Sequence, residues 1–215
     1  MKIGVFDSGV GGLSVVNAIK QALPMHEILY REDKKNIPYG TKTPSELEDL
    51  VLPILQHMVD DDCQVIVIAC NTVTTTIIGS LRKKLTVPII GMEPMIKPAA
   101  AITKSNVVAV CATPTTLASS RYAQLKKEHA HGITVLEPDC SDWAYLIENK
   151  QIDQKHIDTL IDEVCARGAD VIVLGCTHYH WIEEIIVAAA KNRAVVMQPE
   201  LPVIKELTRV ISQLR

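Results

Sequence analysis

The sequence predicts an α/β protein made of two similar halves, each built around a mostly parallel sheet. Short apolar runs alternate with longer amphipathic stretches along the chain, which is the pattern of βα units. An apolar run that ends in Cys70 has a near-copy that ends in Cys176. The N-terminal run that ends at Asp7-Ser8 has a counterpart that ends at Thr113, at nearly the same separation. An internal duplication therefore underlies the fold.

The strands are predicted from apolar, β-branched runs bounded by polar or turn residues. In chain order these runs lie near residues 2–6, 27–31, 64–69, 87–91, 106–111, 132–136, 170–174 and 194–197.

The helices between these strands have recognisable ends. Thr43-Pro44-Ser45-Glu46 has the capping-box pattern with proline at the first helical position, and it predicts a helix that runs to about Val59. Asp153 is a candidate cap for a second helix that runs to Ala166, with Gly168 just beyond it. That helix directly precedes the strand that ends before Cys176.

The division into domains follows from the repeat. A strand ends near Gly91, and the prolines of the segment 94–98 allow the chain to cross over there. We therefore expect a first α/β domain at residues 1–93 and a second at 94–198. The segment 199–215 could close the second domain or return to the first.

Composition excludes several classes of partner. The 215 residues are 47% hydrophobic, and 22 Lys and Arg against 25 Asp and Glu give a net charge of −3. That balance supplies no basic field for nucleic acid or an anionic membrane surface. No apolar stretch reaches the roughly 18 residues of a membrane span, and Asp7 interrupts the first apolar run too early for a signal-peptide core. We expect a cytoplasmic protein. A homodimer is one candidate for its assembly.

Six cysteines are scattered without CxxC spacing, which in a cytoplasmic chain favours free thiols over disulfides. Most are expected to be small core residues. Zinc held by Cys70, Cys176 and His178 is an alternative, because two sulfurs and one imidazole can bind zinc with an open position. We expect no metal, since two similar sites that face each other more naturally bracket a ligand than a single ion.

The candidate site lies at the carboxyl ends of the strands, where open parallel sheets bind ligands. Each of two thiols precedes an expected helix start, which favours the thiolate and lowers the pKa of a free cysteine from about 8.5. Such thiols could act as bases near neutral pH. The polar residues at these strand ends are Asp7, Ser8, Cys70, Asn71, Thr72, Thr113, Thr115, Thr116, Cys176, Thr177 and His178.

Each of these sequence motifs, considered alone, also has a purely structural interpretation. A cysteine after a buried strand is commonly a core residue, and the Asn-Thr or Thr-His that follows can cap a helix. The loop Gly9-Val10-Gly11-Gly12 is neither GxGxxG nor GxxxxGK, so it either brings backbone amides to a small anion or makes a turn. The repetition in matching places favours a functional site.

At these residues the chain resembles the glutamate racemases of the cofactor-independent aspartate/glutamate racemase superfamily. The resemblance covers nearly the whole chain. Four ordered motifs carry it: Ile3-Gly4-Val5-Phe6-Asp7-Ser8-Gly9-Val10-Gly11-Gly12-Leu13, Ile37-Pro38-Tyr39-Gly40-Thr41-Lys42, Ala69-Cys70-Asn71-Thr72, and Leu174-Gly175-Cys176-Thr177-His178-Tyr179.

The resemblance implies that substrate binds in the cleft between two pseudo-symmetric domains and that no cofactor takes part. It assigns Cys70 to the α-proton of D-glutamate and Cys176 to that of L-glutamate, in an enzyme that supplies D-glutamate for peptidoglycan. Supporting catalytic roles fall on Asp7, Asp33, Glu148 and His178. The expected substrate-binding residues are Asp7, Ser8, Pro38, Tyr39, Gly40, Asn71, Thr72, Thr113, Thr115, Thr116, Thr177 and His178.

The chain also departs from the family pattern. Arg31-Glu32-Asp33-Lys34-Lys35-Asn36 stands where relatives usually read Phe-Gly-Asp-Thr-Ala-Arg, His180 replaces a proline, and Gln198-Pro199-Glu200 replaces Asp-Ser-Gly. The charged loop motivates a second hypothesis, a racemase for aspartate or a broad set of amino acids. A third is a catalytically inactive homologue that binds ligand, although a binding protein needs neither cysteine.

Overall fold

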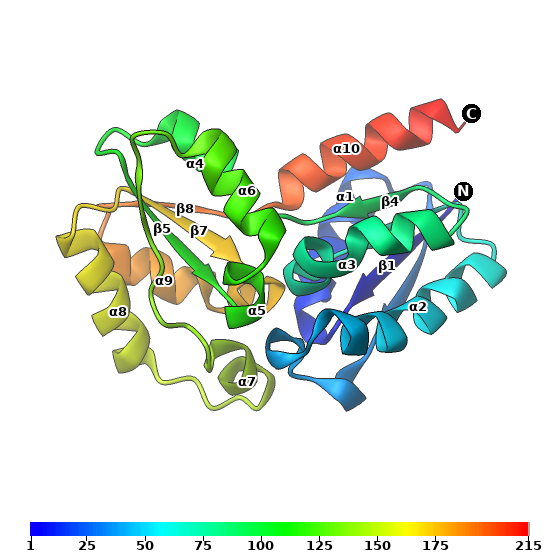
Figure 1. Ribbon diagram of the computed structural model, residues 1–215, viewed down its shortest axis with the longest axis horizontal. Coiled ribbons are helices and arrows are strands. Elements are labelled where there is room, and N and C mark those ends of the chain that lie inside the picture. The colour runs from blue at the N-terminus through cyan, green and yellow to red at the C-terminus, as the bar shows by residue number, and fades with distance from the viewer. Residues whose placement is uncertain (215) are drawn as a thin grey trace.

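The computed structural model describes residues 1–214 and shows two α/β halves side by side (Figure 1). Each half holds a four-stranded sheet whose paired strands run parallel, in the order β2-β1-β3-β4 in the first half and β6-β5-β7-β8 in the second. The two orders correspond strand for strand, so the predicted duplication and fold class are confirmed.

The first half consists of β1 (Lys2–Asp7), η1 (Val10–Gly12), α1 (Leu13–Ala22), β2 (Glu27–Glu32), η2 (Lys34–Asn36), η3 (Tyr39–Thr41), α2 (Pro44–Asp60), β3 (Val65–Ile68), α3 (Asn71–Lys84) and β4 (Ile89–Gly91), where η denotes a 3-10 helix. The second half consists of α4 (Ile96–Ile102), β5 (Val107–Ala112), α5 (Pro114–Leu117), α6 (Ser120–His129), β6 (Thr134–Leu136), α7 (Trp143–Glu148), α8 (Gln154–Ala166), β7 (Val171–Gly175), η4 (Thr177–Ile182), α9 (Glu183–Ala190) and β8 (Val195–Met197). The last helix is α10 (Glu200–Gln213).

The predicted helix ends are confirmed. The Thr43 hydroxyl accepts from the Glu46 amide at 3.3 Å, and the Glu46 carboxylate accepts from the Thr43 amide at 2.8 Å, which completes the capping box of α2. Asp153 accepts from two backbone amides at the start of α8. Side-chain acceptors satisfy the amides that a helix leaves unpaired at its first turn.

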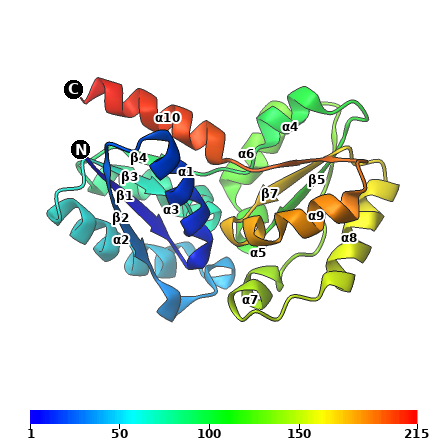
Figure 2. The same cartoon turned by 180° about the vertical axis from the view of Figure 1, so that it is seen from behind.

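Helix α10 packs on the first sheet. Its apolar residues Val203, Leu207 and Val210 share one buried cluster with Ile3 of β1 and Val15 of α1. Seen from behind, α10 lies next to α1 on the same side of the molecule (Figure 2). The domain bounds 1–93 and 94–198 stay a prediction, but this packing favours the return of the last segment to the first domain.

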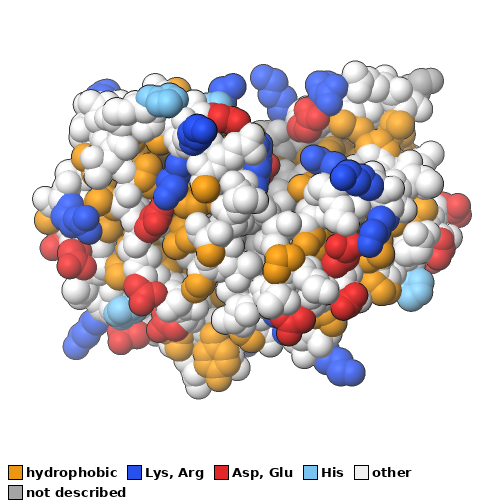
Figure 3. Space-filling model, viewed as in Figure 1, with side chains coloured by type: hydrophobic (Ala, Val, Ile, Leu, Met, Phe, Trp, Pro, Cys, Tyr) orange, Lys and Arg blue, Asp and Glu red, His pale blue; other side chains and the backbone are white. Residues whose placement is uncertain are grey.

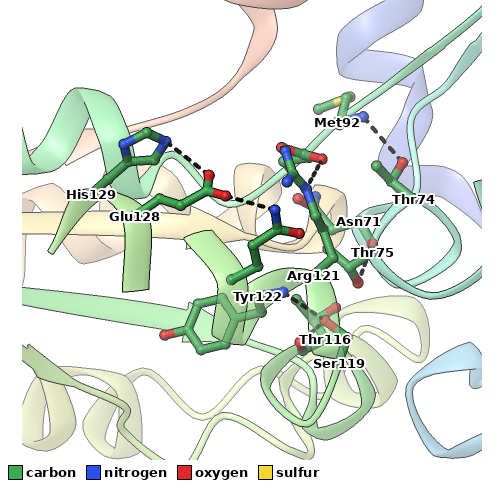
Figure 4. Close-up of polar contacts among 12 residues, drawn as sticks. Asn71, Thr74, Thr75, Met92, Thr116, Ser119, Arg121, Tyr122, Glu128 and His129 are labelled. Atoms are coloured by element: carbon green, nitrogen blue, oxygen red, sulfur yellow. Dashed lines mark hydrogen bonds and ion pairs between the residues drawn. The ribbon is translucent and has the colours of Figure 1, made fainter. Parts of the chain in front are cut away.

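The junction between the halves is fixed by polar contacts as well as by the chain. The Met92 amide, just after β4, donates to the Thr74 hydroxyl of α3 at 3.1 Å (Figure 4). Arg121 of α6 forms two hydrogen bonds with the Glu93 carboxylate, at 2.7 and 2.9 Å. Met92 and Glu93, where the chain leaves the first half, are therefore held by α3 of the first half and by α6 of the second half.

The surface carries charges of both signs in a mixed arrangement on the face shown in Figure 3. This agrees with the small net charge of the chain. Within residues 1–214, no helix is both long and apolar enough to cross a bilayer.

Candidate active site

A cavity of about 330 Å³ lies between the two halves and is lined by residues of both. Cys70 reaches it from the end of β3, and Cys176 reaches it from the end of β7. The duplication thus places one thiol on each side of a single small space. Twelve of the predicted site residues line it: Ser8, Pro38, Tyr39, Gly40, Cys70, Asn71, Thr72, Thr113, Glu148, Cys176, Thr177 and His178.

The environment of Cys70 favours the protonated thiol. Its Sγ lies 3.7 Å from the Ser8 hydroxyl, and the residue is 5% exposed. Burial first, and then the charge of Asp7, raise the pKa of Cys70 to about 12. We expected the N-terminus of α3 to lower this pKa. That prediction was wrong because desolvation of the thiolate outweighs the effect of the helix terminus.

Cys176 belongs to a chain of three side chains. Its Sγ lies 3.8 Å from His178 Nδ1, and His178 Nε2 lies 2.9 Å from the Glu148 carboxylate. Burial alone would lower the pKa of His178, but hydrogen bonds to Cys176 and Glu148 raise it well above its ordinary value. The hydrogen bond from His178 likewise lowers the pKa of Glu148. A protonated imidazole beside the sulfur stabilises negative charge on it.

The element after Cys176 differs from the expected α-helix start. The segment Thr177–Ile182 is the 3-10 helix η4, and the α-helix α9 begins only at Glu183. The two thiols therefore lie in different settings: Cys70 stands at the N-terminus of an α-helix, and Cys176 stands beside an imidazole.

Asp7 is fully buried beneath the site and does not line the cavity. Its carboxylate accepts from the amides of Gly9 and Gly12, at 3.2 and 2.9 Å, and from the Thr177 hydroxyl at 3.1 Å. Burial nevertheless raises its pKa above the ordinary value. The anion that the glycine loop binds is thus the chain's own carboxylate, and Asp7 joins the two halves through Thr177.

Gly11 permits the close approach of the two halves. A Cβ atom on Gly11 would lie 2.7 Å from the backbone nitrogen of His178 and 2.7 Å from the carbonyl carbon of Thr177. Such contacts are shorter than van der Waals distances. A glycine is therefore required here for η1 to pack on η4.

Asp33 also lies behind the cavity wall. Its carboxylate accepts from the Tyr39 hydroxyl at 2.7 Å and from the side-chain amide of Asn36 at 2.9 Å. Tyr39 lines the cavity, and burial together with the hydrogen bond to Asp33 raises its pKa. Asp33 is thus placed to orient Tyr39 and does not itself reach the cavity.

A group of threonine hydroxyls crosses between the halves. Thr72 Oγ1 lies 3.0 Å from Thr113 Oγ1, which donates to Thr116 Oγ1 at 3.0 Å. Thr115 donates to the Gly40 carbonyl. Thr115 and Thr116, which we expected to bind substrate, do not line the cavity. They support Gly40 and Thr113, which do.

Asn71 is the clearest unfilled hydrogen-bonding group of the cavity wall. Its side-chain nitrogen and oxygen are both buried, and neither has a partner within residues 1–214. A buried amide without partners is costly. A ligand with both donors and acceptors would satisfy it.

The sequence interpretation missed several lining residues. Lys34 follows the predicted Asp33 directly, and Ile37 and Thr41 flank the Pro38-Tyr39-Gly40 motif. Around α7, the helical spacing back from Glu148 indicates Tyr145, Ala144 and Ser141, and Asn149 follows Glu148 directly. This period of three to four residues was a usable signal once Glu148 had been placed.

The zinc alternative receives no geometric support. Within the described residues, no group of three or more His, Cys, Asp and Glu side chains is arranged to hold a metal ion. Cys176 and His178 lie together, whereas the polar side chain that contacts Cys70 Sγ is the Ser8 hydroxyl.

Comparisons with known proteins agree on one family. The family model described as Asp/Glu/Hydantoin racemase matches residues 3–205. The chain is 39% identical over 214 residues to a glutamate racemase of Ralstonia pickettii, covering 98% of this chain and 76% of that protein. It is 34% identical to a glutamate racemase of Ectopseudomonas mendocina, with 98% and 82% covered.

Solved structures show the same likeness. A glutamate racemase of Escherichia coli, in complex with L-glutamate and the activator UDP-MurNAc-ala, superposes with a TM-score of 0.91 at 27% identity, covering 98% of this chain and 82% of that one. A glutamate racemase of Francisella tularensis, in complex with D-glutamate, gives a TM-score of 0.81 at 29% identity, covering 99% and 81%.

Proposed function

The chain belongs to the Asp/Glu/Hydantoin racemase family, and from this premise we propose that it interconverts L-glutamate and D-glutamate through two cysteines. The observation that carries the proposal is the placement of Cys70 and Cys176 in one cavity, at the ends of equivalent strands of opposite halves. Inversion at a carbon requires a base on one face and an acid on the other. The duplication supplies both.

The proton transfers balance without a cofactor. In the L-to-D direction the Cys176 thiolate takes the α-proton, and the Cys70 thiol donates its proton to the opposite face. The raised pKa of Cys70 suits the donor, and His178 stabilises the thiolate at Cys176. In the reverse direction Cys70 is the base and Cys176 the acid.

The developing negative charge needs donors that are already in place. We assign this role to Ser8, Asn71, Thr72, Thr113 and Thr177, all of which line the cavity. The two unpartnered amide atoms of Asn71 are suited to one carboxylate and the ammonium group of an amino acid.

The acidic residues have different roles. Glu148 and His178 line the cavity and support Cys176 as a hydrogen-bonded pair. Asp7 and Asp33 are positioning residues that act through Thr177 and Tyr39. The product would feed peptidoglycan synthesis in the cytoplasm.

The first test follows enantiomer interconversion by circular dichroism. The signal of L-glutamate should decay to zero with the protein, and α-deuterium should enter from heavy water. Cys70→Ser and Cys176→Ser should each abolish interconversion. Cys63→Ser and Cys165→Ser are matched controls, because these buried free cysteines do not line the cavity.

Unchanged enantiomers and no deuterium uptake with the pure, folded protein would refute the proposal. Binding of glutamate without exchange would instead support an inactive binding homologue.

A second candidate is a racemase for aspartate or for a broader set of amino acids. The observation that favours it is Lys34, which lines the cavity from the loop where the chain departs from the family pattern. A cation there could bind the carboxylate of a shorter side chain. A panel of enantiopure amino acids, assayed in parallel with glutamate, distinguishes the two.

A further inference from the structure

Three polar side chains meet outside the cavity, where the two halves touch. His180 of η4 places its Nδ1 3.0 Å from the Ser14 hydroxyl of α1 and 3.0 Å from the Glu200 carboxylate of α10. The His180 side chain is 3% exposed and the Glu200 side chain 18%. None of the three lines the active-site cavity. We call them the Ser14-His180-Glu200 cluster.

The chemistry of the cluster identifies the direction of its hydrogen bonds. An ionised carboxylate can only accept, so His180 Nδ1 donates to it. Burial would raise the pKa of Glu200, but the hydrogen bonds and charge of His180, with Ser14, lower it. His180 Nε2 is buried and has no partner within residues 1–214. The polar contacts of the ring therefore run through Nδ1.

Both His180 and Glu200 are departures from the family pattern that the sequence resembles. His180 stands at the position of a proline, and Glu200 stands in the segment that replaces Asp-Ser-Gly. These positions lie 20 residues apart in the chain and 3.0 Å apart in the structure. The two departures form a single contact.

The cluster holds the segment that carries the catalytic groups of the second half. His180 follows His178 by two residues in η4, and Cys176 immediately precedes η4. On the other side of His178, Thr177 donates to Asp7 of the first half. The His178 ring and the Cys176 sulfur thus belong to a short segment that is fixed to the first half at both Thr177 and His180.

We propose that His180 is a positioning residue, which through Ser14 and Glu200 fixes η4 to the first half and so places Cys176 and His178 against the α-carbon of the substrate. This inference deepens the proposed racemase function and rests on it. A small displacement of the catalytic base lowers the reaction rate, because proton transfer requires a well-defined donor–acceptor geometry.

The test compares His180→Gln and Glu200→Gln with Glu206→Gln as a matched control. Glu206 lies on the same helix and pairs with Arg209 at the surface. We expect kcat/KM to fall about tenfold to about a hundredfold in the first two variants, as for loss of a charge-assisted hydrogen bond, and to stay within about twofold in the control. The kcat/KM of the double variant should be little lower than that of either single variant, because each single substitution already breaks the one contact between the two side chains.

Rates alone do not distinguish the two thiols, because enantiomers have equal free energy and kcat/KM must fall equally in both directions. Isotope effects do distinguish them. If the step at Cys176 is slowed, the deuterium isotope effect on kcat/KM should rise for α-deuterated L-glutamate. It should fall toward one for α-deuterated D-glutamate, whose label leaves to Cys70.

Some outcomes would overturn the inference. Variants that lower the melting temperature but keep wild-type kcat/KM would show a purely structural cluster. An equal change of both isotope effects would place the disturbance elsewhere. If His180→Gln fails to fold, Ser14→Ala, which removes a single hydroxyl, should show the same asymmetry at a smaller rate loss. Inactivity of the wild-type protein would instead refute the proposed function.

Discussion

Replacement of Glu148 by Gln tests the support of Cys176 most directly. The carboxylate lies 2.9 Å from His178 Nε2, with the two side chains 14% and 4% exposed. A hydrogen bond between charged groups in such a setting contributes about 1.5 to about 3 kcal/mol. At about 1.4 kcal/mol per factor of ten, kcat/KM should fall about 10-fold to about 150-fold. The loss should be equal in both directions.

The assay is the initial rate of change of circular dichroism, started from each enantiomer over a range of concentrations. Glu137→Gln is the control, because Glu137 accepts from the Tyr122 hydroxyl at 2.9 Å in the same half and does not line the cavity. A Glu148→Gln protein that is folded and retains kcat/KM within about twofold of wild type would refute the reasoning, since a twofold change corresponds to only about 0.4 kcal/mol of transition-state free energy.

Three further predictions concern binding, folding and pH. Lys34→Met should raise the KM for glutamate about fivefold with little change in kcat, as expected for loss of a partly exposed charge; an unchanged KM would exclude contact with substrate. Thr43→Ala should lower the free energy of unfolding by about 1 kcal/mol in urea titrations, because α2 loses its cap, whereas Thr43→Ser should not. The folded-state pKa of Glu148 is depressed, so its stabilisation is present above the unfolded value near about 4.3 and is lost as pH falls. The difference in unfolding free energy between wild type and Glu148→Gln should therefore shrink as the pH falls below the ordinary pKa of a glutamate, and a constant difference would contradict the pKa shift.

The repeat and most of the site could be predicted because both depend on local patterns. Alternating apolar runs placed every strand to within two residues, as for β7, predicted at 170–174 and observed at Val171–Gly175. Parallel strands bring their carboxyl ends together, so Cys70, Thr113 and Cys176 were expected at one place and line one cavity.

What could not be predicted depends on contacts between distant segments. The glycine loop after β1 indicated an anion site, but only the fold shows that Asp7 occupies it. The helix N-terminus at Cys70 suggested a lowered pKa, and burial, which no local pattern reports, reverses the shift. The contact of His180 with Glu200 joins two segments that seemed unrelated departures from a family pattern.

The return of α10 to the first sheet has a mechanical consequence. The backbone passes between the halves twice, at Pro94 and at Pro199, and both prolines border a second surface cavity that shares no lining residue with the active-site cavity. Two separate backbone connections restrain the relative position of the halves more than a single connection would. The hydrogen bonds of Thr177 with Asp7 and of Thr72 with Thr113 join the halves again beside the active-site cavity. The spacing of the two thiols is therefore set jointly by the two chain crossings and by these side-chain contacts.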